Sequence, residues 1–205
     1  MLIEAGKISF YISPAFAVFF ALTANTVAGK TYIVMLIFSL IHESMHIALL
    51  FFCGIKGASL KFGAGGIAME ADGFNLLSYK KTVLCTIIPP VLNIAAGGIC
   101  YFVFLHTENP LIYESAVINL VMGTGNLLPF SFLDGGRALE AFLSLHYHIE
   151  KAMKICDTVS FAVLIITGAV FFLTFITGKR YLFIVFFFFY CLSGYISEKT
   201  KSRIT

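Results

Sequence analysis

The chain has 205 residues, of which 59% are apolar and only 12% are charged, and its mean hydropathy is +0.93. These values exclude an ordinary soluble domain and indicate a protein that is immersed in lipid. The net charge of +3 does not indicate a nucleic-acid-binding surface, because the basic residues stand in short clusters between apolar segments. The five cysteines lack C-x-x-C spacing and are expected to be small buried apolar residues.

Six apolar segments reach the length of about 17 to 25 residues that a helix needs to cross the hydrocarbon of a membrane. They are residues 8–28, 31–53, 82–105, 111–130, 157–177 and 181–197. The first segment is too long for the apolar part of a signal peptide, so we expect it to be retained as a span. The sequence therefore predicts an all-α integral membrane protein with a single six-span domain over residues 1–205.

Lysine and arginine are unevenly distributed between the two sides that six spans define. The N-terminus, the connections after the second and fourth spans, and the C-terminus together hold 11 of these residues, whereas the opposite side holds 3. Short cytoplasmic loops of membrane proteins accumulate basic residues. We therefore expect a multi-pass protein with both termini in the cytoplasm.

The second span contains the H-E-x-x-H motif His42-Glu43-Ser44-Met45-His46. On a helix, His42 and His46 lie one turn apart on one face, so both imidazoles can reach one zinc ion, while Glu43 polarises a metal-bound water. Ionisable side chains at the centre of a membrane helix cost about 2.5 to 3.5 kcal/mol each on insertion scales, and a bound metal would offset this cost. The alternative, a polar cluster that only contacts neighbouring helices, explains two histidines and a glutamate within one turn poorly.

The connection from residue 54 to residue 81 is the least apolar part of the chain. It alternates apolar and small residues around Gly65 and Gly66, a pattern that predicts a short membrane-associated β-hairpin between the second and third spans. A flexible loop is the alternative, because glycine-rich strands are weakly specified.

A catalytic zinc site needs three protein ligands and one open position, so the motif requires a third ligand from elsewhere. The acidic candidates are Glu70, Asp72, Glu114, Asp134 and Asp157. Only Asp134 stands in a segment suited to present a carboxylate at membrane depth, because Pro129 breaks the preceding helix and Gly135-Gly136 permits a sharp turn. Irregular backbone at such depth is tolerated where it lines protein or a water-filled cavity. A plain interfacial loop is the alternative for Asp134.

Three motifs, in this order along the chain, resemble the site-2 protease family of intramembrane zinc metalloproteases. They are the H-E-x-x-H motif, Pro90-Val91-Leu92-Asn93 in the third span, and Asn126-x-x-Pro129 followed by Leu133-Asp134-Gly135-Gly136. The resemblance covers nearly the whole chain, and the six-span layout resembles the branch that processes a sporulation sigma factor. It implies a zinc endopeptidase of the bacterial cytoplasmic membrane that cleaves a membrane-spanning or membrane-associated protein near the cytoplasmic face.

The resemblance also implies roles for individual residues. The zinc ligands are expected to be His42, His46 and Asp134, and Glu43 is expected to be the general base. Zn²⁺ is the expected cofactor.

The residues expected to contact the substrate come from three other parts of the chain. Asn126 and Asn93 are expected to bind the substrate backbone or the developing oxyanion. Gly65 and Gly66 belong to the hairpin, which resembles the strand element of the family that pairs with an unwound substrate. The expected partners are a membrane-protein substrate, the lipid bilayer and a regulatory membrane protein, with no nucleic acid.

Three residues differ from the usual family pattern. Met45 and Pro89 stand where the family usually has glycine, and Phe132 stands where it often has proline. All three are packing positions, so they bear on helix packing and gating more than on catalysis. They leave open a second function, a catalytically silent relative that binds a membrane partner. A metal transporter is a third reading, but its ligands would be spread along several spans.

Overall fold

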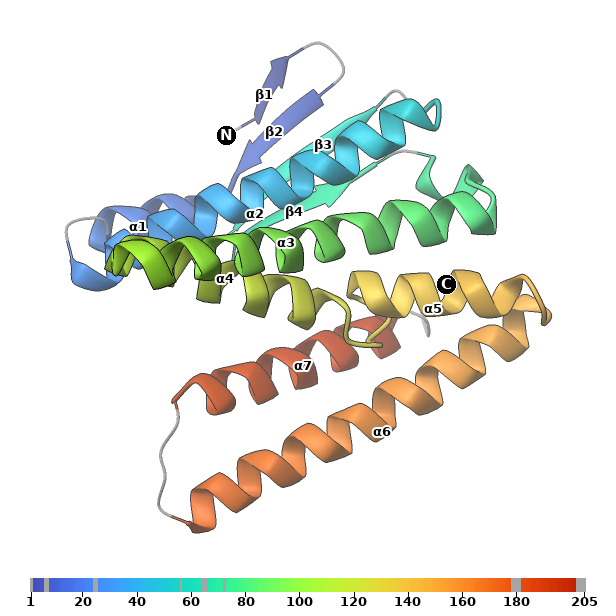
Figure 1. The fold of residues 1–205 in the computed structure, drawn as a ribbon. Helices are drawn as coiled ribbons and strands as arrows, with labels where there is room; N and C mark the ends of the chain where they lie inside the picture. The colour runs from blue at the N-terminus through green and yellow to red at the C-terminus, as the bar shows by residue number, and fades with distance from the viewer. Residues whose placement is uncertain are drawn as a thin grey trace. The chain divides into compact units, whose positions relative to one another are not determined.

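The computed structural model describes residues 2–5, 8–23, 26–55, 57–63, 66–71, 73–177 and 182–201. Gly65 and Asp72, both singled out above, lie outside these ranges. The chain forms two compact units, Met1–Gly125 and Asn126–Thr205, which we describe in turn. The described residues are mostly helical and include one four-stranded sheet, which belongs to the first unit (Figure 1).

The sheet of the first unit joins the N-terminal residues to the segment that follows the second predicted span. Its strands lie in the order β1 (Leu2–Ala5), β2 (Ile8–Ile12), β3 (Ala58–Gly63) and β4 (Gly66–Glu70). The pairs β1–β2 and β3–β4 are antiparallel, whereas β2 and β3 are parallel, with Ile8 opposite Ala58. The segment in which we expected a hairpin therefore contributes two strands, β3 and β4, to a larger sheet. The other two strands, β1 and β2, come from N-terminal residues that we had not expected to form strands.

The first predicted span, residues 8–28, is not a single helix in the structure. Residues 8–12 form strand β2, and the helix that follows, α1 (Pro14–Thr23), has only 10 residues. Ser13 separates them, because its side-chain oxygen accepts from the Phe16 N–H at 3.1 Å and Pro14 has the backbone angle of a first helical residue. At about 1.5 Å per residue, α1 covers only half of a hydrocarbon core about 30 Å thick.

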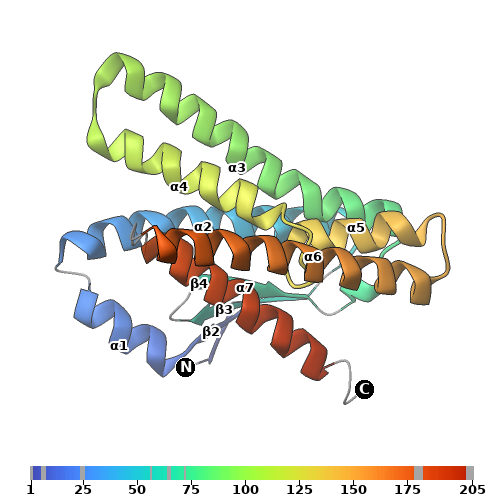
Figure 2. The same ribbon diagram turned by 90° about the horizontal axis from the view of Figure 1, so that it is seen from below.

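Three further helices complete the first unit: α2 (Val27–Phe52), α3 (Tyr79–Thr107) and α4 (Pro110–Asn126). A 3₁₀ turn, Phe74–Leu76, precedes α3. Helix α2 packs on the sheet, where Ile47 lies in one buried cluster with Leu60 and Ile67. Helix α3 contacts α2, and α4 turns back along α3 (Figure 2).

The second unit contains α5 (Asp134–Ser144), α6 (Ile149–Ile176) and α7 (Leu182–Lys201). Helix α6 contacts both α5 and α7. The core of this unit is a buried cluster of Phe130, Leu133, Leu164 and Cys191. Phe130 and Leu133 belong to the irregular segment before α5, so this segment is anchored in the core of its unit.

Three helices among the described residues are long and apolar enough to cross a membrane: Gly29–Phe52, Tyr79–Thr107 and Ile149–Thr174. They coincide with three of the six predicted spans. Helix α4, with 17 residues, and helix α7 are not among them. The count of six spans therefore stays a prediction.

Candidate metal centre

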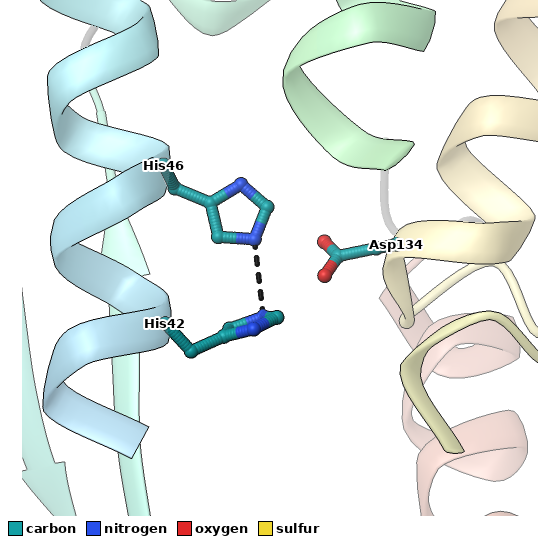
Figure 3. Close-up of side chains that lie close together, drawn as sticks. All are labelled: His42, His46 and Asp134. Atoms are coloured by element: carbon teal, nitrogen blue, oxygen red, sulfur yellow. Dashed lines mark hydrogen bonds between the residues drawn. The ribbon is translucent and has the colours of Figure 1, made fainter. Parts of the chain in front are cut away.

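The two histidines of the H-E-x-x-H motif lie side by side on α2. Thr26 caps the start of this helix, because its side chain accepts from the Gly29 N–H at 2.9 Å, and the helix continues from Val27 through the motif without a break. A separation of four residues places His42 and His46 on one face, and only 3% and 4% of their surfaces are exposed. Their Nε2 atoms are 3.2 Å apart, the contact marked by the dashed line in Figure 3.

The Nδ1 atom of each histidine faces an oxygen atom of α3. The side-chain oxygen of Asn93 lies 3.2 Å from His42 Nδ1, and the backbone carbonyl oxygen of Cys85 lies 3.0 Å from His46 Nδ1. Neither oxygen carries a hydrogen, so both Nδ1 atoms must be the donors. A neutral imidazole has one N–H, and therefore both Nε2 atoms present a lone pair.

This pair of lone pairs is suited to a metal ion. If both rings are neutral and both Nδ1 atoms donate, only lone pairs meet across the 3.2 Å between the Nε2 atoms, and a cation would accept both of them. Zinc binds neutral imidazole nitrogen, and metal-binding histidines almost always donate their other N–H to an oxygen acceptor. The residues around His42 and His46 therefore fit a metal centre.

Asp134 occupies a well-defined position in the second unit. It is the first residue of α5, and only 8% of its surface is exposed. A carboxylate is favoured at a helix N-terminus, where the helix dipole and free N–H groups are positive. The preceding segment is held by the hydrogen bonds Leu133 N to Phe130 O at 2.8 Å and Ser160 Oγ to Pro129 O at 2.8 Å.

The glycines after Asp134 allow close backbone contact. A Cβ atom on Gly135 would lie 2.1 Å from the carbonyl oxygen of Leu127, and one on Gly136 would lie 2.0 Å from that of Phe130. No side chain larger than hydrogen fits at either position unless the backbone moves. The two glycines therefore hold the start of α5 against residues 127–131.

His42, His46 and Asp134, drawn in Figure 3, offer two imidazole nitrogens and a carboxylate oxygen that could hold a metal ion. This is the donor set of a common class of catalytic zinc site. Asp134 belongs to the second unit, whereas the histidines belong to the first. That all three bind the same metal ion is part of the proposed function.

The other acidic candidates for a third ligand have different surroundings. Glu70 forms an ion pair with Lys61 at 2.5 Å on the exposed surface of the sheet. Asp157 forms an ion pair with Lys199. Glu114 is half-buried and accepts from the Thr31 hydroxyl at 3.4 Å. None of these three lies in a group of possible metal ligands among the described residues.

The remaining predicted site residues lie as follows. Glu43 follows His42 on α2 and is half-buried, and Asn126 ends α4 and is half-buried. Gly66 begins β4 with φ of +132°, a conformation that favours glycine. Asn93 contacts His42, and its NH₂ group donates to Met122 Sδ at 3.1 Å, so both ends of its amide are engaged inside the protein.

The Cys85 carbonyl oxygen, which lies 3.0 Å from His46 Nδ1, was not predicted from the sequence as a partner of His46. A signal was present, since Pro89 stands four residues later and cannot supply the N–H that would normally bond to this carbonyl.

Comparisons with known proteins indicate a protease fold. No protein-family model matches the chain. A zinc metalloprotease of Methanocaldococcus jannaschii is 29% identical over 133 residues, which are 62% of this chain but only 38% of that relative's length. The solved structure of a site-2 protease from the same organism matches with a TM-score of 0.68 at 20% identity, and the match covers 97% of this chain and 94% of that chain. The chain therefore has the fold of that site-2 protease.

Proposed function

We propose that this chain is an intramembrane zinc endopeptidase of the site-2 protease type. The observation that carries the proposal is the buried histidine pair of α2, in which each Nδ1 atom faces an oxygen acceptor and the two Nε2 atoms lie 3.2 Å apart. The fold match, the zinc metalloprotease among its relatives and the three long apolar helices support it. The substrate is a membrane-spanning or membrane-associated protein that is cut near the cytoplasmic face.

In this proposal, His42, His46 and Asp134 would hold one Zn²⁺. Bound zinc would lower the pKa of a water and polarise the scissile carbonyl. Glu43 is next to a ligand and takes the proton from the attacking water, then transfers it to the leaving amine. Asn126 donates its side-chain amide to the oxyanion that develops on the carbonyl.

The position of the motif within α2 determines how far water and substrate must reach to meet the metal centre. His46 lies six residues before the end of α2 at Phe52, or about 9 Å of helix. A transmembrane substrate must unwind locally, because a helical backbone has its carbonyls in hydrogen bonds. Strand β4 is the last strand of the sheet and contacts α2, so its outer edge can pair with an unwound peptide.

Two further expectations stay predictions. They are the cytoplasmic location of both termini and the resemblance to the sporulation branch of the family.

The experiment compares wild type with Glu43→Gln, each co-expressed with candidate single-span membrane proteins. We expect a shortened product with wild type only, while the purified Glu43→Gln protein keeps its zinc, because the ligands are intact. A catalytically silent relative that acts by binding a membrane partner would give the same effect with both proteins. Equal cleavage by Glu43→Gln and wild type would contradict the role of Glu43.

A further inference from the structure

Helix α3 contains two consecutive prolines in its interior, Pro89 and Pro90, and both are fully buried. Proline in a helix removes the N–H that would bond to the carbonyl four residues earlier, and its ring pushes against that carbonyl. The carbonyls released in this way belong to Cys85 and Thr86. In a membrane-spanning helix, such carbonyls need another hydrogen-bond donor.

The carbonyl that Pro89 releases is the one that His46 uses. Cys85 O accepts from His46 Nδ1 at 3.0 Å, and Cys85 is only 2% exposed, so this carbonyl is shielded from bulk solvent. If residue 89 carried an N–H, it would compete with His46 for the Cys85 oxygen. Because Pro89 has no N–H, the carbonyl oxygen of Cys85 on α3 is left to accept a hydrogen bond from His46 on α2.

The second acceptor lies further along the same helix. Asn93 is 3% exposed, and its Oδ1 accepts from His42 Nδ1 at 3.2 Å. Its NH₂ group points to Met122 Sδ on α4, at 3.1 Å, which keeps the oxygen turned toward the histidine. Each histidine of the motif therefore has its own oxygen acceptor on α3.

We propose that Pro89 and Asn93 are positioning residues that hold both histidines in the form with hydrogen on Nδ1, so that both Nε2 lone pairs face the metal. The inference rests on the proposed zinc centre and deepens it. It replaces the expectation that Asn93 binds substrate, because both ends of its amide are engaged with His42 and Met122. A histidine without its acceptor can rotate or move its hydrogen to Nε2, and in that form it cannot bind zinc through Nε2.

The test measures the zinc dissociation constant of detergent-purified protein by chelator competition, together with the visible absorption of the Co²⁺-loaded protein. Removal of a partner that orients a metal-binding histidine typically weakens metal binding by about 10- to 100-fold. We expect this loss for Asn93→Leu, with a changed Co²⁺ spectrum. We expect Asn93→Asp to restore the affinity, because a carboxylate oxygen is also an acceptor.

Two matched controls separate positioning from packing. Asn119 is also a buried asparagine of the first unit, with 2% of its surface exposed, but its amide donates to Ser115 O and not to a histidine. Asn119→Leu should therefore leave the zinc affinity unchanged. Pro89→Ala restores an N–H opposite Cys85 O and should weaken zinc binding. Pro90→Ala restores an N–H opposite Thr86 O, which is not one of the two oxygens that face the histidine Nδ1 atoms, and should leave zinc binding unchanged.

The outcomes distinguish this inference from the proposed function. If wild type binds no zinc, the proposed metal centre itself is wrong. If wild type binds zinc, and both Asn93→Leu and Pro89→Ala bind it equally well, the positioning role is wrong while the metal centre stands. If Asn93→Asp binds zinc as weakly as Asn93→Leu, the asparagine acts through packing, and its positioning role is wrong. The Pro89 comparison provides a test even if Asn93→Leu does not fold.

Discussion

The Gly136→Ala substitution tests whether the start of α5 must lie directly against residues 127–131. A Cβ atom at this position would be 2.0 Å from Phe130 O and 2.6 Å from Ser131 N, whereas ordinary contact begins at 3.4 Å. The backbone would have to separate by about 1.4 Å, the difference between 3.4 and 2.0 Å. Asp134 precedes Gly136 by two residues and would move with it.

The expected magnitude is set by two opposing effects. Overpacking of a buried contact costs about 1 to 3 kcal/mol, whereas glycine to alanine within a helix gains about 0.5 to 1 kcal/mol. The net destabilisation is therefore modest, on the order of 1 kcal/mol. Activity should suffer more, because a displacement of about 1 Å at a reacting centre can lower the rate by about 100-fold.

The assay compares zinc content, cleavage rate and unfolding midpoint of Gly136→Ala with those of wild type. The matched control is Gly98→Ala, since Gly98 is also in a helix and a Cβ there would meet nothing within 4 Å. The control should keep its zinc and its cleavage rate. A Gly136→Ala protein with wild-type zinc content and cleavage rate would refute the argument that this contact sets the position of Asp134.

The remaining predictions concern the metal, pH and topology. Purified protein should hold about one zinc per chain, and His42→Ala, His46→Ala or Asp134→Ala should each remove most of it by metal analysis. Full zinc retention in the Asp134 variant would assign the third ligand to another residue. Burial, and secondarily the negative charge of Asp157, raises the pKa of the Glu140 carboxyl on α5. Ionised Glu140 therefore costs stability as pH rises through its folded pKa, so Glu140→Gln should raise the unfolding midpoint at pH about 7 and change it less at pH about 4, near the unfolded pKa. A gain that is equal at both pH values would contradict this cause. A reporter fused to the C-terminus should be cytoplasmic, and an external C-terminus would mean that one predicted span does not cross.

The sequence by itself determined the features that depend on local spacing. His42 and His46 share one face of α2 because four residues are close to one helical turn, whatever the rest of the chain does. Long apolar segments predicted the helices α2, α3 and α6, since length and hydropathy are properties of the segment alone. The irregular segment around Pro129 was also predictable, because proline cannot continue a helix. The sharp turn expected at Gly135-Gly136 was wrong, because both glycines lie in the first turn of α5, where they permit close backbone contact instead.

Only the tertiary structure decided the features that depend on distant partners. Residues 8–12 are as apolar as a membrane helix, yet they form β2 because they pair with β3, about 50 residues later in the chain. The role of Asn93 depends in the same way on α3 packing beside α2, which brings its oxygen to His42. Hydrogen-bond partners and strand neighbours are chosen by the packing of whole elements, and no pattern within one segment specifies them.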